Sequence, residues 1–398
     1  MAATPLENVL IAGGGIGGLA TALALAKRGI CSEVLERRPA FGDDGAGIQL
    51  GPNGTRILEQ LGAASFLRGH VTVPDALRIL DSVTGEQLAR FPLGEWIAQR
   101  HGAPYWVAHR RDLHAALLSA VEREPHIQLR KNIEVTSAHE EADEVVAVCV
   151  RGETFRGNLL IAADGAWSAL RGRLFSGGMP QYTGKSAVRV VIPIEEVPEA
   201  LRRTEVHLWL GHNVHVVHYP VSAGYAMALV AIFDDQAVSG DWSTPCDREW
   251  VAARTAGFAP LLRDLLGKPG HWRRWSLLGL EKPPRFSAGR MALIGDAAHP
   301  VFPFLAQGGV MALEDAVVIA DALAHEPDRP AHAFKAYERA RAGRVRRVAE
   351  ASRTNGRIYH LAGFMAKARN LTLAHIPPET FMRRYDWLYG WKQAEDDA

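Results

Sequence analysis

The hydrophobic pattern of the first 36 residues changes three times. Residues 9–12 form a short apolar run typical of a buried strand, and six residues rich in glycine follow it. Residues 19–28 are rich in alanine and leucine and stop before Gly29, which predicts a helix. Residues 31–35 then predict a second strand, with Glu36 at its end. The chain should therefore open as strand, tight turn, helix and strand.

The spacing of the glycines suits a bound dinucleotide. Gly13, Gly15 and Gly18 permit a tight turn and close approach of the backbone to a pyrophosphate, whose charge a helix N-terminus stabilises. Glu36 follows Gly18 at the distance where its carboxylate can accept hydrogen bonds from ribose hydroxyls. The alternative is a close-packed turn without a ligand, but the flanking strands, the helix and the acid together favour the dinucleotide site.

Three later segments are also predicted strands or turns that end at a polar group. Residues 159–163 predict a buried strand ending in Asp164-Gly165, and residues 291–294 predict another ending in Gly295-Asp296. Each acid alone could simply cap a neighbouring helix. Residues 303–309 place proline and glycines before a helix, whose first amides can stabilise negative charge or form an ordinary cap. The cofactor segments thus lie near residues 13, 164 and 296, so we expect a discontinuous domain.

The middle of the chain has strand periodicity. Residues 181–280 predict several strands with short turns and a helical stretch at 248–266, which suggests an antiparallel sheet over the cofactor. The predicted strands are 187–194, 206–210, 214–219 and 226–233. His215 and Tyr219 share one face of their strand, and His218 points to the other. We interpret His207, His212 and His299 as structural residues.

Composition narrows the class of protein. The 398 residues are 47% hydrophobic and 22% charged, as in ordinary globular proteins, and 45 basic against 44 acidic residues leave a formal charge of +1. This balance argues against nucleic acid as a partner and favours small molecules. Three scattered cysteines give neither a disulfide framework nor a metal site, which fits a reducing cytoplasm. Residues 9–26 are apolar, but their five glycines and the preceding Glu7 argue against a membrane span or signal peptide.

Two C-terminal segments are unusual in composition. Residues 331–356 predict a basic helix, whose arginines we interpret as a solvated face. These arginines are Arg339, Arg341, Arg344, Arg346, Arg347 and Arg353. Residues 357–392 concentrate aromatic side chains, which should pack within the chain or form a homodimer. The aromatic residues are Phe381, Tyr385, Trp387, Tyr389 and Trp391.

The whole chain resembles the class A flavoprotein aromatic hydroxylases of the salicylate hydroxylase-like group, and within it the 3-hydroxybenzoate hydroxylases. The resemblance rests on the motifs above and on finer matches at residues 45–53, 215–220, 272–275 and 386–392. It implies an α/β fold with a Rossmann-type FAD-binding domain, a β-sheet substrate domain and C-terminal helices. The expected FAD-binding domain spans residues 1–180 and 284–330, the substrate domain 181–283 with a contribution from about 70–105, and the helical region 331–398.

The resemblance also implies roles for individual residues. Asp296 would bind the ribityl chain of FAD, Asp164 would support the nucleotide, and Arg110 would reach the phosphates. His215 and Tyr219 would be catalytic. Tyr105, Pro303 and Phe304 would line the substrate site. The residues expected to bind the cofactor are Gly13, Gly15, Gly18, Glu36, Arg37, Gln49, Arg110, Asp164, Asp296, Gln307, Gly308 and Gly309.

One departure from the family pattern concerns the substrate. The 3-hydroxybenzoate enzymes carry glutamine where this chain has Pro303, so the polar amide is lost. Phe302, Pro303 and Phe304 instead make this segment apolar and aromatic. A bulkier phenol such as a flavonoid, salicylate, or a hydroxypyridine acid are therefore alternatives to 3-hydroxybenzoate.

The resemblance implies a reaction with two cofactors, although we find one dinucleotide fingerprint. FAD would be bound noncovalently, and NADH or NADPH would bind transiently, deliver a hydride and leave. Reduced flavin and O2 would form a C4a-hydroperoxide that hydroxylates the phenol. Histidine suits removal of the phenol proton because its pKa lies near neutrality, which favours His215 as the base. The rival class is an FAD oxidase, a dehydrogenase or a non-catalytic flavoprotein.

Overall fold

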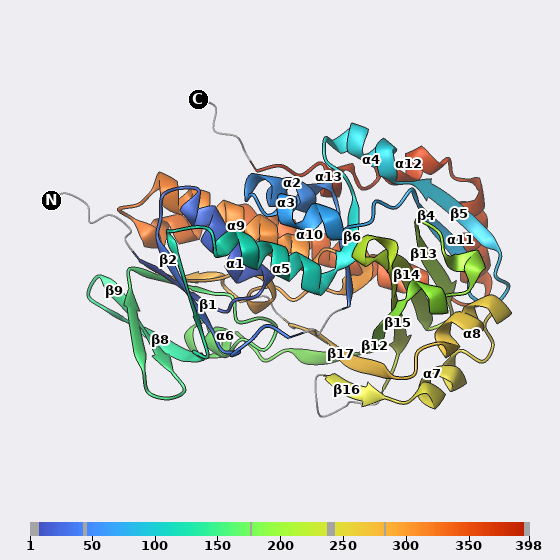
Figure 1. Cartoon of the computed structure of the whole chain (residues 1–398), viewed down its shortest axis with the longest axis horizontal. Coiled ribbons are helices and arrows are strands. Elements are labelled where there is room, and N and C mark those ends of the chain that lie inside the picture. Colours follow the sequence, from blue (N-terminus) through green and yellow to red (C-terminus); the bar gives the residue numbers. More distant parts are fainter. Residues whose placement is uncertain (1–7, 43–45, 176, 237–242, 282–283, 394–398) are drawn as a thin grey trace.

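The computed structural model describes residues 8–42, 46–175, 177–236, 243–281 and 284–393. Figure 1 shows one sheet near the chain's N-terminus and a second, larger sheet beside it, with helices along one side of both. The first sheet has the strand order β18-β19-β11-β1-β2-β7, and the second has the order β16-β17-β12-β15-β14-β13-β4-β5. The predicted α/β class with a Rossmann-type part and a second β-sheet is confirmed.

The first sheet joins strands that lie far apart in the sequence. β1, β2, β7, β11 and β19 run parallel, and β18 pairs antiparallel at the edge. The strands are β1 (Val9–Ala12), β2 (Ser32–Glu36), β7 (Ile127–Lys131), β11 (Leu159–Ala162), β18 (Ser287–Ala288) and β19 (Met291–Leu293). Because β1, β11 and β19 are parallel neighbours, their carboxyl ends bring the glycine turn and both acidic turns to one edge.

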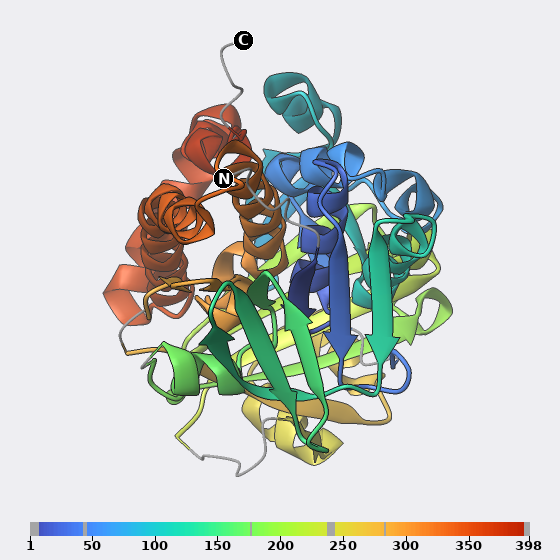
Figure 2. The ribbon, with the colours of Figure 1, turned by 90° about the vertical axis from the view of Figure 1, so that its left-hand side faces the viewer.

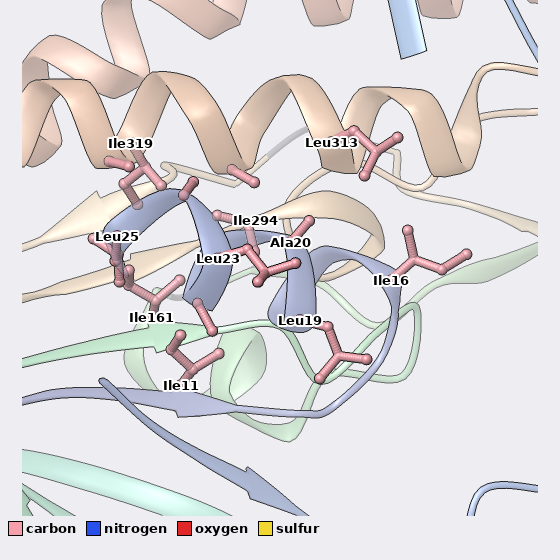
Figure 3. Close-up of a cluster of buried hydrophobic side chains, with 14 of the residues drawn as sticks. Ile11, Ile16, Leu19, Ala20, Leu23, Leu25, Ile161, Ile294, Leu313 and Ile319 are labelled. Carbon is pink, nitrogen blue, oxygen red and sulfur yellow. The ribbon is translucent and has the colours of Figure 1, made fainter. Parts of the chain in front are cut away.

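Helix α1 (Ile16–Ala26) is apolar around most of its circumference because it is covered on two sides. Figure 3 shows α1 between strands of the first sheet and helix α9 (Gly308–His325), with Leu19 toward the sheet and Leu313 on α9. This burial explains why residues 9–26 are as apolar as a membrane-spanning segment. Among the described residues, no helix is long and apolar enough to cross a membrane.

The second sheet is mainly antiparallel, and its strands agree with the predicted ones. Its members are β4 (Ala76–Asp81), β5 (Gln87–Pro92), β12 (Gln181–Pro193), β13 (Glu205–Gly211), β14 (Val214–Val221), β15 (Ala226–Asp234), β16 (Ser243–Cys246) and β17 (Trp272–Gly279). The predicted helical stretch at 248–266 is two helices, α7 (Arg248–Arg254) and α8 (Pro260–Gly267). Pro260 starts the second helix and disfavours helical backbone in the residue before it.

Smaller elements connect the two sheets. A three-stranded sheet and a two-stranded sheet accompany them, together with several helices. The strands are β3 (Gly47–Leu50), β6 (Trp106–His109), β8 (Val135–Glu141), β9 (Glu144–Cys149) and β10 (Thr154–Gly157). The helices are α2 (Pro52–Gln60), α3 (Ala64–Leu67), α4 (Gly94–His101), α5 (Arg110–Val121) and α6 (Ala169–Leu174).

Helix α10 (Pro330–Tyr359) corrects part of the sequence interpretation. Arg339, Arg346, Arg347 and Arg353 are exposed as predicted. The prediction was wrong for Arg341, which is buried and donates to Glu314 at 2.8 Å and Asp315 at 2.7 Å on α9. It was also wrong for Arg344, which is half-buried and bonds Glu314, at Nε and Nη2. These arginines join α10 to α9 because buried carboxylates need charged partners.

The aromatic tail packs within the chain. It contains α11 (Gly363–His375), α12 (Pro378–Arg383) and α13 (Asp386–Tyr389), which lie with α10 on one side of the molecule (Figure 2). Phe381 stacks on Phe91 of β5 at 3.9 Å between ring centroids. Trp387 and Trp391 lie against the α10 arginines, with Arg347 4.0 Å from the Trp387 ring. The intramolecular alternative is therefore confirmed, and a homodimer stays a prediction.

Candidate active site

A cavity of about 360 Å³ lies where the two sheets meet. Its walls combine the N-terminal ends of α1 and α9 with one face of the second sheet. Of the predicted site residues, it is lined by Gly15, Gln49, Arg110, His215, Tyr219, Asp296, Pro303, Gly308 and Gly309. The remaining predicted residues lie outside the lining set: Gly13, Gly18, Glu36, Arg37, Tyr105, Asp164, Phe304 and Gln307. Within the described ranges, no group of three or more His, Cys, Asp or Glu side chains is placed to hold a metal ion.

The glycine turn has the close approach that its sequence predicts. Gly13 has a φ of +112°, and a Cβ on Gly18 would lie 1.9 Å from the Gly13 carbonyl oxygen. Gly15 precedes α1, and no atom lies within 4 Å of the position its Cβ would take. The turn therefore leaves open space at the α1 N-terminus, as a phosphate group requires.

Glu36 is held against this turn. Its Oε2 accepts from the Gly14 amide at 2.7 Å, and its Oε1 accepts from the Arg38 amide at 2.9 Å. The carboxylate thus stiffens the loop and keeps acceptor capacity for a hydroxyl. Arg37, beside it, is exposed, and its cofactor role stays a prediction.

Replacing Glu36 by Ala should weaken FAD binding by about 1–3 kcal/mol, because a buried acceptor for the ribose and the turn is lost. Equilibrium titration of the flavin-free protein with FAD, followed by flavin fluorescence, measures this change. Glu59→Ala, at an exposed ion pair with Arg68, is the matched control. If both variants bind FAD with equal affinity, Glu36 does not contribute to FAD binding.

The two acidic turns are tied together by a residue that the sequence reading missed. Arg171 of α6 is fully buried and donates to the carbonyl oxygens of Ala166 at 2.7 Å and Ala297 at 3.0 Å. It therefore joins the turn after β11 to the turn after β19. A lone arginine in a short helix carries no periodic signal, so the pattern could not reveal it.

The acids in these turns have different surroundings. Asp164 Oδ2 accepts from the Leu170 amide at 3.3 Å, whereas its buried Oδ1 has no hydrogen-bond partner among the described residues. Burial raises the pKa of Asp164 and of Asp296. Asp296 is exposed and lines the cavity. An unpartnered acceptor and an acid in the cavity wall both fit a ligand with hydroxyl donors, as FAD has.

The N-terminus of α9 closes the same end of the cavity. Gly308 and Gly309 line it, and a Cβ on Gly309 would lie 2.9 Å from Ile48 Cδ1. Gln307 is buried and accepts from Asn53 Nδ2 at 2.9 Å, so it positions the turn from behind. The amides at the start of this 18-residue helix can stabilise negative charge on a flavin ring. Together with Arg110, these residues fit FAD.

The facing wall belongs to the second sheet. His215 and Tyr219 both line the cavity from β14, which agrees with their predicted shared face. A Cβ on Gly47 would lie 2.7 Å from the Tyr219 hydroxyl, so glycine is required there. Tyr105 is buried and donates to Gln49 Oε1 at 2.7 Å, so it reaches the cavity through Gln49. Burial raises the pKa of Tyr219, which keeps its hydroxyl protonated as a donor.

His215 is enclosed by aromatic rings. Its ring centroid lies 5.4 Å from Phe304 and 5.3 Å from Tyr359, and its Nδ1 lies 2.8 Å from Nε2 of His360. Burial lowers its pKa well below 6.5, so the imidazole is neutral at pH 7. Phe304 therefore packs against His215, whereas Pro303 lines the cavity directly.

Arg189 of β12 is a cavity residue that the sequence reading did not single out. Its Nε is buried without a hydrogen-bond partner in the described part of the chain, and its guanidinium lies 5.4 Å from the Trp275 ring. Burial and the nearby Arg110 lower its pKa to about 10, so it stays cationic at pH 7. A partly unsatisfied cation in a cavity wall is suited to an anionic ligand.

The opposite face of β14 carries a histidine pair. His218 stacks on His207 with ring centroids 4.4 Å apart, and both are buried. This agrees with the interpretation of His207 as a structural residue and with the predicted orientation of His218 away from His215. His299 is also structural, since its Nε2 lies 2.7 Å from Asp315 Oδ2. Burial lowers the pKa of His207 to about 4 and that of His218 well below 6.5.

This pair should make the protein sensitive to acid. Both histidines are neutral when folded and bind protons when unfolded, so their contribution is complete above about pH 6.5 and declines as the pH falls toward 4. The free energy of unfolding in urea should drop by about 2 kcal/mol per histidine between pH 7.5 and pH 5. His218→Leu should remove its share of that drop. An unchanged pH dependence in His218→Leu would contradict the assignment.

Comparisons with known proteins agree with this geometry. A family model described as "FAD binding domain" matches residues 7–352. The chain is 38% identical to 3-hydroxybenzoate 6-hydroxylase from Klebsiella oxytoca, over 97% of each protein. It is 35% identical to 3-amino-4-hydroxybenzoate 2-monooxygenase PtnB3 from Streptomyces platensis, over 98% of each.

The fold of this chain is also similar to that of solved structures. Klebsiella pneumoniae HpxO complexed with FAD and uric acid matches with a TM-score of 0.85 and 27% identity, over 96% of each chain. A salicylate hydroxylase substrate complex matches with a TM-score of 0.81 and 26% identity, over 98% of this chain and 96% of the other. The matches run through both sheets and the C-terminal helices, and they confirm the resemblance seen in the sequence. This chain belongs to the FAD-binding domain family, among its FAD-dependent aromatic hydroxylases.

Proposed function

We propose that this protein hydroxylates the phenolic ring of a small aromatic acid, with 3-hydroxybenzoate as the first candidate, and consumes NAD(P)H and O2. One observation carries the proposal. His215 and Tyr219 line the same cavity as Asp296, Gly308 and Gly309, which we predict to bind FAD. A phenol held there would lie between a base and the flavin site.

The charge in the cavity supports an acid as substrate. Arg189 can pair with a carboxylate, and both Arg189 and Trp275 line the same cavity as His215. Relatives that match nearly the full chain are named as 3-hydroxybenzoate and 3-amino-4-hydroxybenzoate hydroxylases. Phe302 and Pro303 make another wall apolar, so a bulkier phenol, salicylate and a hydroxypyridine acid belong in any substrate test.

Each group then has a physical role. FAD, when bound, supplies hydride acceptance and activation of O2. His215 takes the phenol proton, which raises the electron density of the ring, and Tyr219 orients the phenol oxygen by donating a hydrogen bond. Phe302 and Phe304, whose rings stack 5.6 Å apart, exclude water from this end of the cavity. The α9 amides stabilise negative charge at the cofactor.

The proposal is tested with the unaltered protein and a panel of phenols. We expect substrate-stimulated oxidation of NADH or NADPH, one product 16 mass units heavier than the phenol, and incorporation of ¹⁸O from ¹⁸O2. An oxidase would instead give an oxidised product and stoichiometric hydrogen peroxide. FAD binding without any turnover of the panel would favour the non-catalytic flavoprotein.

Replacing Arg189 by Met should raise the KM for 3-hydroxybenzoate by about 10–100-fold, because a charge-assisted hydrogen bond is lost. The neutral analogue 3-hydroxybenzyl alcohol serves as the matched control, since it has no carboxylate to lose a partner. Steady-state kinetics on both compounds distinguish the outcomes. An equal rise in the KM values for both compounds would show that Arg189 shapes the cavity without binding the carboxylate.

A further inference from the structure

A short chain of hydrogen bonds leads from the cavity wall to the surface. His215 Nδ1 lies 2.8 Å from His360 Nε2, and His360 Nδ1 lies 2.9 Å from Asp234 Oδ1. His215 is only 2% exposed, whereas the Asp234 side chain is 38% exposed. His360 follows the last turn of α10 and thus connects β14 to the end of β15. The three side chains thus link a buried residue of the cavity wall to a partly exposed carboxylate.

The partners determine where the protons lie. A carboxylate can only accept, so His360 Nδ1 carries the hydrogen that faces Asp234. His360 Nε2 is then an acceptor, and His215 Nδ1–H donates to it. This leaves Nε2 of His215 without a hydrogen, and His215 lines the cavity. The outer acid therefore holds the inner imidazole in the tautomer that a base requires.

A base in this position cannot keep the proton that it accepts. His215 is enclosed by Phe304 and Tyr359, and burial lowers its pKa. A positive charge on its ring would be poorly solvated. A proton from a phenol must therefore move onward for the phenolate to persist.

We propose that His215, His360 and Asp234 form a proton relay between the substrate and solvent; this inference rests on the proposed function. The phenol O–H bond breaks, and its proton binds Nε2 of His215. The Nδ1 proton of His215 moves to Nε2 of His360, and the Nδ1 proton of His360 moves to Asp234 and then to water. One proton leaves, both rings change tautomer and stay neutral, and the reverse shift restores them when the product takes a proton back.

Few other charged or titratable groups face the relay. Lys185 of β12 forms an ion pair with Asp234, and its Nζ lies 3.4 Å from His360 Nδ1. This ammonium lies at the outer end of the relay and balances the charge of the Asp234 carboxylate. His212 lies in the turn between β13 and β14, and Tyr359 packs beside His215. His360 does not line the cavity, so it is a positioning residue that acts through His215.

The relay is tested by proton release on binding. The oxidised holoenzyme is mixed with 3-hydroxybenzoate in weak buffer containing an indicator dye, and the change in flavin absorbance reports binding. The unaltered enzyme should release close to one proton per site. His360→Phe should still bind the phenol, but its proton release and hydroxylation should slow by about 10–100-fold, less than the loss of the base itself. Asp234→Asn should slow release in the same direction.

Two further variants make the test decisive. His360→Gln retains polar atoms but cannot pass a proton, so it should behave like His360→Phe even where the latter folds poorly. His212→Gln removes the neighbouring titratable group and should release protons as the unaltered enzyme does. Nitrogen-15 shifts of the His215 ring should show the Nδ1–H tautomer in the free protein, and loss of that preference in His360→Phe, which has no acceptor at this position.

The outcomes separate the relay from the proposed function. If the unaltered enzyme hydroxylates its phenol but His360→Gln releases protons at the original rate, the relay alone is wrong. An Nε2–H tautomer of His215 in the free protein also overturns the relay. If the unaltered enzyme hydroxylates no phenol of the panel, the proposed function fails, and the relay fails with it.

Discussion

His215→Ala should retain FAD binding and hydride transfer but lose hydroxylation by roughly 10²–10⁴-fold, the usual effect of removing a positioned base. Neither FAD binding nor hydride transfer needs the phenol proton. Without the base, the phenol stays protonated and its ring is a poorer nucleophile, so the reduced oxygen should leave as hydrogen peroxide. The ratio of hydroxylated product to NAD(P)H consumed measures this uncoupling, at several pH values.

The same strand supplies the control. His218 lies on the opposite face of β14, stacked on His207, so His218→Leu should keep the product ratio of the unaltered protein at neutral pH. Tyr219→Phe should alter the orientation of the substrate more than the rate of flavin reduction, since only a hydroxyl is lost. If His215→Ala keeps normal coupling and pH dependence, His215 is a structural histidine and the base lies elsewhere, with Tyr105 or Tyr219 next.

Arg341→Met should lower the free energy of unfolding by about 3–5 kcal/mol, because it removes the buried cation that both buried carboxylates share. Glu314 and Asp315 are both fully buried on α9. Burial alone would raise the pKa of Asp315, but His299 and Arg341 hold it at about 2, so the acid stays ionised. Urea unfolding at pH 7.5 measures the loss. Arg346→Met, at an exposed position of the same helix, should change stability by less than about 0.5 kcal/mol.

The arginine variant should also weaken FAD binding. Asp315 Oδ2 accepts from the Gly295 amide at 2.8 Å and so holds the turn that presents Asp296 to the cavity. A loosened Asp315 would let this turn move, and a flavin titration would report the change in affinity. An unfolding free energy equal to that of Arg346→Met would show that Arg341 contributes no net stabilisation.

Local signals in the sequence predicted the cofactor half of the site. The apolar run, the glycine turn, the helix and Glu36 lie within 36 residues, and each follows from backbone sterics or hydrophobic period. Strand alternation likewise predicted that His215 and Tyr219 share a face and that His218 does not. The roles of Asp164, Asp296, Gly308 and Gly309 came from resemblance, and the parallel pairing of β1, β11 and β19 explains how they meet.

The burial and the partners of charged residues were the features that the sequence predicted least well. The local sequence does not distinguish the arginines of α10 from one another, yet Arg341 is buried and Arg346 is exposed. The difference arises because the acids that pair with Arg341 lie on a different helix. Arg189 and Arg171 gave no periodic signal, and only the packed structure shows that one lines the cavity and the other joins two turns.

The sequence by itself determined the elements, the dinucleotide turn and the face of the strand that carries His215. Only the tertiary structure decided which charges are buried and that His360, 145 residues from His215 along the chain, meets it at the cavity wall. The physical reason is that backbone preference and hydrophobic period act over a few residues, whereas the solvation of a charge depends on all the elements that pack around it.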